Sequence, residues 1–215
     1  RMHSDIMQII NVFYNNSLID GNNSLKNPIK EHGLTISSIN NTPLITPNNH
    51  AYWIDSSSFA GHNVYESRRD GSTSAENKLE AEIIVEMLGK MEEEYLNKNI
   101  KNRVQVGVIS FYYDQVVLIR KLLKNRTFYT MNIDINTVDR FQGKEKSIIF
   151  VSLVRNVKNH MHSTNSHIAA FQRINVAFSR AKELLVIVGS KDMYAEQPVL
   201  ISNMNTGEER EVMVY

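Results

Sequence analysis

Short apolar runs recur along the chain, and polar residues bound each of them. The runs lie at 51–54, 104–110, 133–137, 147–153 and 183–189. Those centred on Ile148–Val151 and Leu184–Val188 are too densely apolar for a sheet with one face in water. Runs of this length and density predict strands buried on both faces, which occur in parallel sheets covered by helices.

Between these runs, apolar residues recur at the three- and four-residue spacing of a helix. Such stretches lie at 74–95, 116–123 and 168–181, and another begins near the start of the chain. There Ser4 is an expected N-cap, and the apolar face consists of Ile6, Ile9, Ile10 and Phe13. The alternation of strands and helices predicts an α/β domain with a mainly parallel sheet and helices on both faces.

The remaining stretches predict connections. Residues 20–49 are rich in Asn, Gly and Pro, and residues 56–73 are polar, so both read as loops. After Asp192 the alternation stops, and 199–215 is expected to be a hairpin around Asn205-Thr206-Gly207 or a tail. We therefore expect one domain at 1–195 and a C-terminal tail or hairpin at 196–215.

The amino-acid composition excludes several kinds of protein. The 215 residues include no cysteine, which excludes disulfides and thiolate metal sites and fits a reducing, intracellular (cytoplasmic or nuclear) location. No apolar run approaches the roughly 18 residues of a membrane helix, and no signal peptide is visible. We expect no membrane partner.

The formal net charge of +1 conceals an asymmetry. From Lys98 to Lys191 there are 16 Lys and Arg residues against 5 Asp and Glu, a balance of +11. We call this segment the basic block. It indicates a surface that faces a polyanion, although a solvated face without a partner is the alternative.

Two polar segments lie directly beside the apolar runs. Residues 137–145 read Thr-Val-Asp-Arg-Phe-Gln-Gly-Lys-Glu, and residues 173–182 read Arg-Ile-Asn-Val-Ala-Phe-Ser-Arg-Ala-Lys. Because functional groups in parallel α/β folds gather on loops at strand ends, both segments are candidate sites.

These segments resemble motifs V and VI of superfamily 1 helicases, in the 1B-type branch that contains the up-frameshift RNA helicases and the DNA2-like helicases. Residues 106–115, Val-Gly-Val-Ile-Ser-Phe-Tyr-Tyr-Asp-Gln, resemble motif IV, and the opening Arg1-Met2-His3 resembles the stretch that enters the second RecA-like domain. The resemblance covers most of 1–189. It implies a RecA-like three-layer sandwich.

The resemblance implies a set of nucleotide-binding residues. Arg180 matches the arginine finger of motif VI, which stabilises charge on the transferred phosphoryl group. Arg1 matches a second arginine that reaches the γ-phosphate. Arg173 lies two helical turns before Arg180 and is expected to support the same phosphate region. Further nucleotide contacts are expected from the motif V residues Gln142, Gly143 and Glu145.

The resemblance also implies contacts to single-stranded DNA or RNA. Thr137 matches a hydroxyl that binds a nucleic-acid phosphate, and we include the adjacent Val138. Ser110 and Tyr112 match positions that line the strand channel. Phe111 stands where the family usually has Pro, which leaves the local backbone path open.

The sequence contains no Gly-x-x-x-x-Gly-Lys-Ser/Thr loop and no acidic Walker B strand end. ATP and Mg²⁺ are therefore expected to be held mainly by a first RecA-like domain outside these residues, and this chain alone is expected to be inactive. His160, His162 and His167 lack a nearby carboxylate, so no metal site is expected.

Two functions stay open at this point. The first is the second RecA-like domain of an ATP-dependent helicase, with the first RecA-like domain of the same polypeptide as its partner. The alternative is a non-catalytic nucleic-acid-binding or scaffold domain that retains the fold. The motifs do not distinguish DNA from RNA.

Overall fold

The computed structural model describes residues 2–14, 16–19, 31–37, 43–57, 59, 61–156, 171–194, 198–202 and 209–213. The helices are α1 (Ser4–Asn11), the short 3-10 helix η1 (Val12–Tyr14), α2 (Lys78–Asn97), α3 (Tyr113–Leu123), α4 (Val138–Phe141), α5 (Phe171–Phe178) and α6 (Lys191–Tyr194). The strands are β1 (Ile36–Ser37), β2 (Pro43–Ile45), β3 (Ala51–Asp55), β4 (Val104–Ser110), β5 (Met131–Thr137), β6 (Lys146–Ser152), β7 (Ala181–Gly189), β8 (Pro198–Ser202) and β9 (Glu209–Met213).

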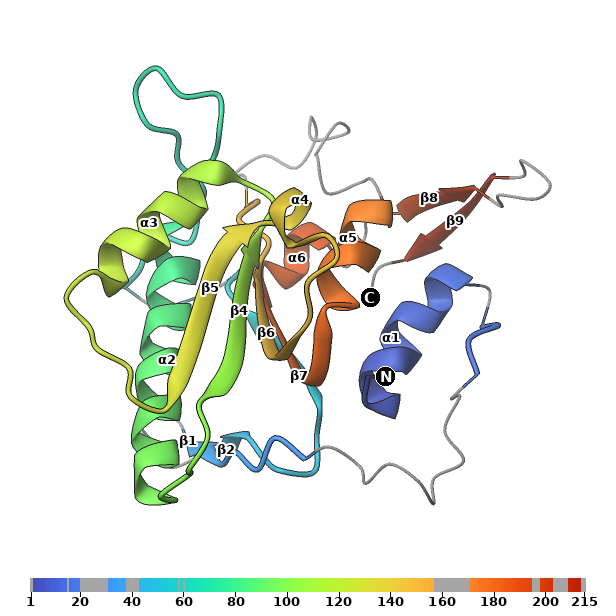
Figure 1. The fold of residues 1–215 in the computed structure, drawn as a ribbon. Helices are drawn as coiled ribbons and strands as arrows, with labels where there is room; N and C mark the ends of the chain where they lie inside the picture. Colours follow the sequence, from blue (N-terminus) through green and yellow to red (C-terminus); the bar gives the residue numbers. More distant parts are fainter. Residues whose placement is uncertain are drawn as a thin grey trace.

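Five strands form one parallel sheet in the order β3-β7-β6-β4-β5 (Figure 1). Each predicted apolar run is a strand of this sheet, and β4 has the predicted bounds. Pairing is in register across the centre, where Val108 of β4 lies beside Phe150 of β6. The prediction of a parallel α/β sheet is confirmed.

Alternate residues of each central strand enter different cores. Ile148 and Phe150 of β6 pack into a core with α2, α3 and the small β1–β2 sheet. Ile149 and Val151 pack into a second core with α1, α4, α5 and α6. Figure 1 shows α2 and α3 on one side of the sheet and α1 and α5 on the other. The three-layer sandwich is therefore confirmed.

The two ends of the chain refine the expectations. The N-cap of α1 is His3 and not Ser4, because the Nδ1 atom of His3 accepts the N–H of Asp5 at 3.2 Å. At the other end, β8 and β9 pair antiparallel, and the predicted turn at Asn205-Thr206-Gly207 lies outside the described residues. Within the described residues, no helix is both long and apolar enough to cross a bilayer.

The connections of two neighbouring strands, β4 and β6, run in opposite directions along the sheet. After β4 the chain forms α3 and returns through β5, whereas the connection from β6 to β7 contains α5 on the opposite face. The carboxyl ends of β4 and β6 are therefore a topological switch point. In open α/β sheets this is the place where ligands bind.

Gly107 in β4 allows α4 to lie close to the sheet. A Cβ atom at this position would lie 2.5 Å from Cδ1 of Ile149 and 2.9 Å from Cζ of Phe141. Phe141 is fully buried at the end of α4 and fills the space that a side chain on Gly107 would occupy. The position of α4 therefore depends on a glycine at residue 107.

We predict that Gly107→Ala lowers stability by about 1–3 kcal/mol, because Ile149 and Phe141 must both shift in a packed core. The control is Gly89→Ala in α2, where the new Cβ would meet only the flexible end of Arg126. Alanine is favoured over glycine in a helix by roughly 1 kcal/mol, so this variant should not lose stability. Urea denaturation of both proteins measures the difference, and equal midpoints would contradict the prediction.

Candidate functional site

Motif V and motif VI meet at the amino edge of the sheet, where β6 and β7 begin. The N–H of Lys146 donates to the carbonyl of Arg180 at 3.0 Å, and Nη1 of Arg180 donates to the carbonyl of Lys144 at 3.4 Å. Nζ of Lys182 lies 3.3 Å from Oε2 of Glu145. Glu145 and Arg180 are thus brought together, although 35 positions separate them in the sequence.

Arg180 lies just beyond α5 and occupies the carbonyl end of that helix. Its Nε donates to the carbonyl of Val176 at 2.9 Å, and its Nη2 donates to Oγ of Ser179 at 2.8 Å. A cation here also interacts favourably with the helix dipole. The guanidinium can therefore stabilise the end of α5. It can bind a phosphate instead if its hydrogen bonds to the carbonyls of Val176 and Lys144 are released.

The other motif V residues at this edge lie on the surface. Gly143 has φ of +80°, a left-handed conformation that favours glycine, and nothing lies within 4 Å of where a Cβ would be. Gln142 beside it is exposed. The predicted residues Gln142, Gly143, Glu145 and Arg180 therefore share one edge, where a nucleotide could approach the backbone.

Arg173 does not join this group. It lies at the opposite end of α5 from Arg180, where its Nη2 pairs with Oδ2 of Asp139 at 2.9 Å. Its guanidinium carbon lies 5.7 Å from the centre of the Phe111 ring, just after β4. Asp139 and Phe111 thus lie at the other end of α5 from Arg180, and the expectation that Arg173 supports the same phosphate region as Arg180 stays a prediction.

The predicted site residue Arg1 lies outside the described residues, and so do His160, His162 and His167, where no metal site is expected. Within the described part of the chain, no group of three or more His, Asp or Glu side chains could hold a metal ion.

The predicted strand-binding residues lie at the carboxyl edge of the sheet, where β4 and β5 end. Their side chains differ in how far they are exposed to solvent. Ser110 is 0% exposed and Val138 1% exposed, Tyr112 is 7% exposed, and Thr137 is partly exposed. Ser110 donates to the carbonyl of Ser152 at 3.2 Å. Burial leaves Ser110 and Val138 without side-chain surface for a strand, so their packing fixes the loops and does not form the contact.

Tyr113 is the exposed aromatic residue of the motif IV loop. Phe111 and Tyr112 turn into the core, whereas Tyr113 begins α3 and is 54% exposed. The register of the sheet pairs Ser110 with Thr137, so the loops after β4 and β5 are neighbours. Sequence reasoning missed Tyr113 because three consecutive aromatic residues give no indication of which one faces solvent.

A buried polar network underlies this edge. Oε2 of Glu80 accepts from Oγ of Ser152 at 2.7 Å and from the N–H of Val154 at 2.9 Å. Nε2 of Gln115 donates to Oγ of Ser152 at 2.9 Å and to the carbonyl of Asn77 at 3.0 Å. The network ties the start of α2 to the carboxyl ends of β4 and β6.

Glu80 is fully buried at the centre of this network. Burial disfavours its charged form and raises the pKa of Glu80 to about 7, although Ser152, Val154 and Ser56 all donate hydrogen bonds that favour the carboxylate. The raised pKa means that ionisation of Glu80 opposes folding, so this group costs stability as pH rises from its unfolded pKa towards 7.

The sequence around Glu80 contains a local pattern, the spacing of a capping box. Asn77-Lys78-Leu79-Glu80 fits the spacing of a capping box, in which the glutamate would return to the N-cap N–H. Asn77 does cap α2 by accepting the N–H of Glu80 at 3.1 Å. The N–H of Asn77, however, donates to Oε1 of Gln115 at 2.8 Å. Gln115 replaces the glutamate, whose carboxylate instead binds the end of β6.

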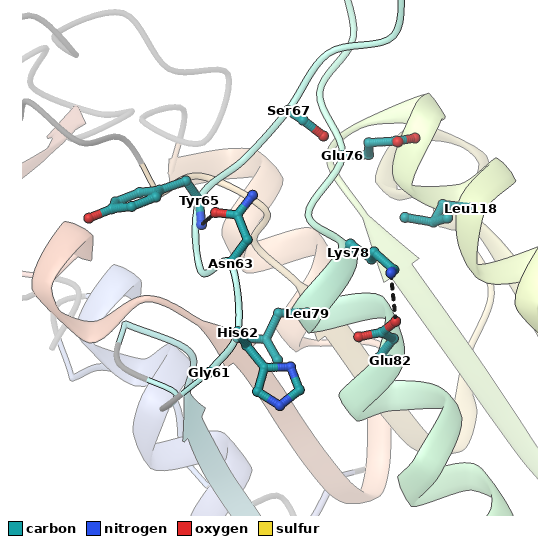
Figure 2. Close-up of a pocket in the computed structure, with 10 residues that line it drawn as sticks. All are labelled: Gly61, His62, Asn63, Tyr65, Ser67, Glu76, Lys78, Leu79, Glu82 and Leu118. Atoms are coloured by element: carbon teal, nitrogen blue, oxygen red, sulfur yellow. Dashed lines mark hydrogen bonds and ion pairs between the residues drawn. The ribbon is translucent and has the colours of Figure 1, made fainter.

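A pocket of about 350 Å³ opens beside the network, between residues 61–67, the start of α2 and α3 (Figure 2). Its charged lining includes Glu76, Lys78 and Glu82, and Nζ of Lys78 pairs with Oε1 of Glu82 at 3.4 Å. None of the predicted site residues lines it. The charges partly compensate each other, so the pocket gives no indication of a particular ligand.

Three histidine rings pack together at the amino edge, between α1 and the starts of β3 and β7: His3 stacks on His50, and His32 meets His50 edge-on. The ring centres of His3 and His50 are 3.4 Å apart, and those of His32 and His50 are 5.0 Å apart. Nδ1 of His50 donates to the carbonyl of Glu183 at 2.6 Å. This cluster fastens α1 to the sheet beside the candidate nucleotide edge.

The pKa values of two of these histidines are lowered. Nδ1 of His32 accepts the N–H of Leu34 at 3.1 Å, and Nε2 faces the carbonyl of Asn49 at 2.9 Å. Burial and the neighbouring His50 and His3 lower the pKa of His32, against the opposing charge of Glu31. Burial and His50 also lower the pKa of His3, against Asp5.

Comparison with known proteins matches the whole sheet domain. A family model described as an AAA domain matches residues 1–192. The DNA replication ATP-dependent helicase/nuclease JHS1 of Arabidopsis thaliana is 34% identical over 134 residues, which are 62% of this chain and 9% of that protein. An uncharacterized ATP-dependent helicase of Methanocaldococcus jannaschii is 29% identical over 208 residues, 93% of this chain and 27% of that protein.

A further relative is the helicase sen1 of Schizosaccharomyces pombe, which is 34% identical over 127 residues, 58% of this chain and 7% of that protein. The chain therefore spans less than a third of the length of each of these relatives.

We predict that the contribution of His3 and His32 to the free energy of unfolding decreases as pH falls from about 7 to about 5, whereas that of Glu80 changes in the opposite direction. The pKa values of His3 and His32 are lowered in the folded state, so their contribution is present above the unfolded value of about 6.5. It is lost as pH falls towards the lowered values. His32→Gln supplies a donor and an acceptor that do not titrate here, so the difference in free energy of unfolding between the unaltered protein and this variant should decrease as pH falls, and urea denaturation measures it.

The control is His62→Gln, which changes an exposed histidine of the pocket and should leave the pH dependence as it is in the unaltered protein. A pH dependence unchanged in the His32 variant would remove His32 from this contribution.

Proposed function

Because the chain belongs to the AAA domain family and to the 1B-type branch of superfamily 1 helicases, we propose that it is the second RecA-like motor domain of an ATP-dependent helicase. The observation that carries this proposal is the meeting of Arg180 with the Lys144–Glu145 loop at the amino edge of the sheet. The substrate proposed is single-stranded DNA or RNA inside the cell.

ATP and Mg²⁺ would be held mainly by the first RecA-like domain of the same polypeptide, because the sequence here has no phosphate-binding loop. ATP supplies the phosphoryl group that is transferred to water. Arg180 would donate its planar guanidinium to the phosphate oxygens on which charge develops. Gly143 and Glu145 would lie against the nucleotide from the same edge, and Arg1 would reach the γ-phosphate.

Arg180 would have two states with different partners. In the structure, the guanidinium binds the carbonyls of Val176 and Lys144. These partners are neutral, so the guanidinium keeps its full charge at the helix end. Closure of the two domains on ATP would exchange these carbonyls for phosphate oxygens, which bind a guanidinium more strongly.

The carboxyl edge would carry the strand. Thr137 would bind a phosphate, and Tyr113 offers a ring on which a base can stack. The basic block supplies the long-range attraction, because each phosphate neutralised by Lys or Arg releases counterions. A non-catalytic strand-binding domain would use the same edge, so ATP turnover decides between the two functions.

We predict that Arg180→Ala in the full-length protein lowers strand-stimulated kcat by about 10³-fold or more, because an arginine finger acts mainly on the transition state. Arg180→Lys should recover little, since a point charge cannot reproduce the planar fork. Strand affinity should change little. The measurement is kcat per folded molecule, with the melting temperature taken on the same preparation.

Arg103→Ala is the matched control. Arg103 also binds main-chain carbonyls, those of Phe128 and Tyr129, and these partners lie just before β5, outside motifs V and VI. Its loss should lower stability and leave kcat per folded molecule unchanged. If the two variants behave alike, Arg180 only caps α5.

We predict that strand binding has a steep salt-dependent part and a smaller salt-independent part. The salt-dependent part comes from the basic block, and the other from stacking on Tyr113, worth about 1–3 kcal/mol per base. Tyr113→Ala should lower affinity by a similar factor at low and high salt, and Tyr113→Phe should not. Fluorescence anisotropy with a labelled single strand measures both parts.

Tyr129→Ala is the control for an exposed tyrosine. Tyr129 is 70% exposed and lies before β5, at the opposite edge of the sheet. It should have no effect on strand binding, and a loss equal to that of Tyr113→Ala would contradict the placement of the strand.

A further inference from the structure

Val154 has a backbone conformation that β-branched residues rarely adopt. Its φ is +72°, and the N–H of Arg155 donates to the carbonyl of Leu153 at 2.8 Å, which closes a γ-turn around it. A γ-turn with positive φ is strained, and persists only where the surroundings hold it. Val154 is completely buried directly after β6, so solvent plays no part in holding the turn.

Two side chains of α2 hold the strained turn from both sides. Oε2 of Glu80 accepts the N–H of Val154 at 2.9 Å, and Nδ2 of Asn77 donates to the carbonyl of Val154 at 3.2 Å. Both peptide groups that flank the residue are thus fixed by buried partners. Glu80 contributes a buried carboxylate, whose burial is costly and has to be offset by what it binds.

The turn directs the next residue towards motif IV. Nε of Arg155 pairs with Oε2 of Glu66 at 2.7 Å, and its Nη1 lies 3.5 Å from the hydroxyl of Tyr112. The N–H of Asn156 donates to the same carboxylate at 3.1 Å. In this way the turn links the end of β6 to the loop after β4, across the topological switch point.

Strained backbone at such a point is a reason to look for function, because strain is retained where a site needs one fixed geometry. The Val154 turn lies between the motif IV loop and the buried network, and no nucleotide-edge residue touches it. A well-packed hydrophobic turn would end β6 without a buried carboxylate or a strained valine. The arrangement therefore serves the position of the carboxyl edge.

We propose that Glu80 is a positioning residue for strand binding: its carboxylate holds Val154 in the strained turn, and the turn fixes Arg155 against Tyr112 at the strand edge. This inference rests on the proposed function. It assigns a role to a residue that would not itself touch nucleic acid, in a reaction whose chemistry takes place at the other edge of the sheet.

The test uses the full-length protein and a single-stranded homopolymer of deoxythymidine or of uridine. Glu80→Met removes the acceptor, and should raise the homopolymer concentration for half-maximal ATPase stimulation about tenfold while kcat at saturation is retained. Glu80→Gln keeps one acceptor oxygen and should stay close to the unaltered protein. The same variants are compared by thermal unfolding.

A second substitution separates positioning from stability. Glycine adopts the backbone conformation of Val154 without strain, so Val154→Gly in the Glu80→Met background should restore most of the response to homopolymer. It also removes a buried side chain, so the melting temperature should not recover. If Glu80 only stabilises the fold, Val154→Gly should worsen both the response to homopolymer and the melting temperature of the Glu80→Met protein. That result would overturn the proposal.

Glu66→Gln provides an independent arm if Glu80→Met does not fold. It weakens the anchor of Arg155 while Glu80 stays in place, and should raise the half-maximal concentration several-fold, on the order of the loss of one charged hydrogen bond. If the half-maximal homopolymer concentration is unchanged in Glu80→Met or in Glu66→Gln, the role of Glu80 is overturned while the proposed function still stands. An unaltered protein whose ATPase ignores homopolymer overturns the proposed function instead.

Discussion

Burial of the parallel sheet on both faces is the constraint on which the rest of this structure depends. Ile148 and Phe150 face one core while Ile149 and Val151 face the other, so the central strands offer no face for polar chemistry. Polar side chains can reach solvent only at the two edges where the strands begin and end. The candidate nucleotide residues and the candidate strand residues accordingly lie at opposite edges.

Helix α5 and the short helix α4 connect these two edges. At one end Arg173 pairs with Asp139 beside Phe111, and at the other Arg180 binds the carbonyl of Lys144. The same two segments, motifs V and VI, therefore touch each other twice, once at each edge. A shift of α5 driven at the nucleotide edge would be felt at the strand edge, because a rigid helix transmits displacement along its axis.

The excess of positive charge also has a structural basis. Several arginines of the basic block bind main-chain carbonyls: Arg103 binds those of Phe128 and Tyr129, Arg120 that of Ile135, and Arg126 that of Val85. A carbonyl satisfies the donor without neutralising the charge. The chain thus uses arginines to fasten loops and helix ends, while it keeps a positive potential suited to a polyanion.

The sequence by itself determined the layers, because the dense apolar runs and the helical spacing between them leave one way to bury both faces. It also predicted the two polar segments, 137–145 and 173–182, that carry Thr137, Gly143 and Arg180. It did not determine which side chains would be exposed within those loops, since Ser110 and Val138 turn inward whereas Tyr113 turns outward. Nor did it separate Arg173 from Arg180, because helical spacing places both on one face, and only the tertiary contacts show that Arg173 meets Asp139 and Arg180 meets Lys144. The role of Glu80 was decided by tertiary structure alone: a capping-box spacing reports local geometry, while its carboxylate is bound by Ser152 and Val154, more than seventy positions away.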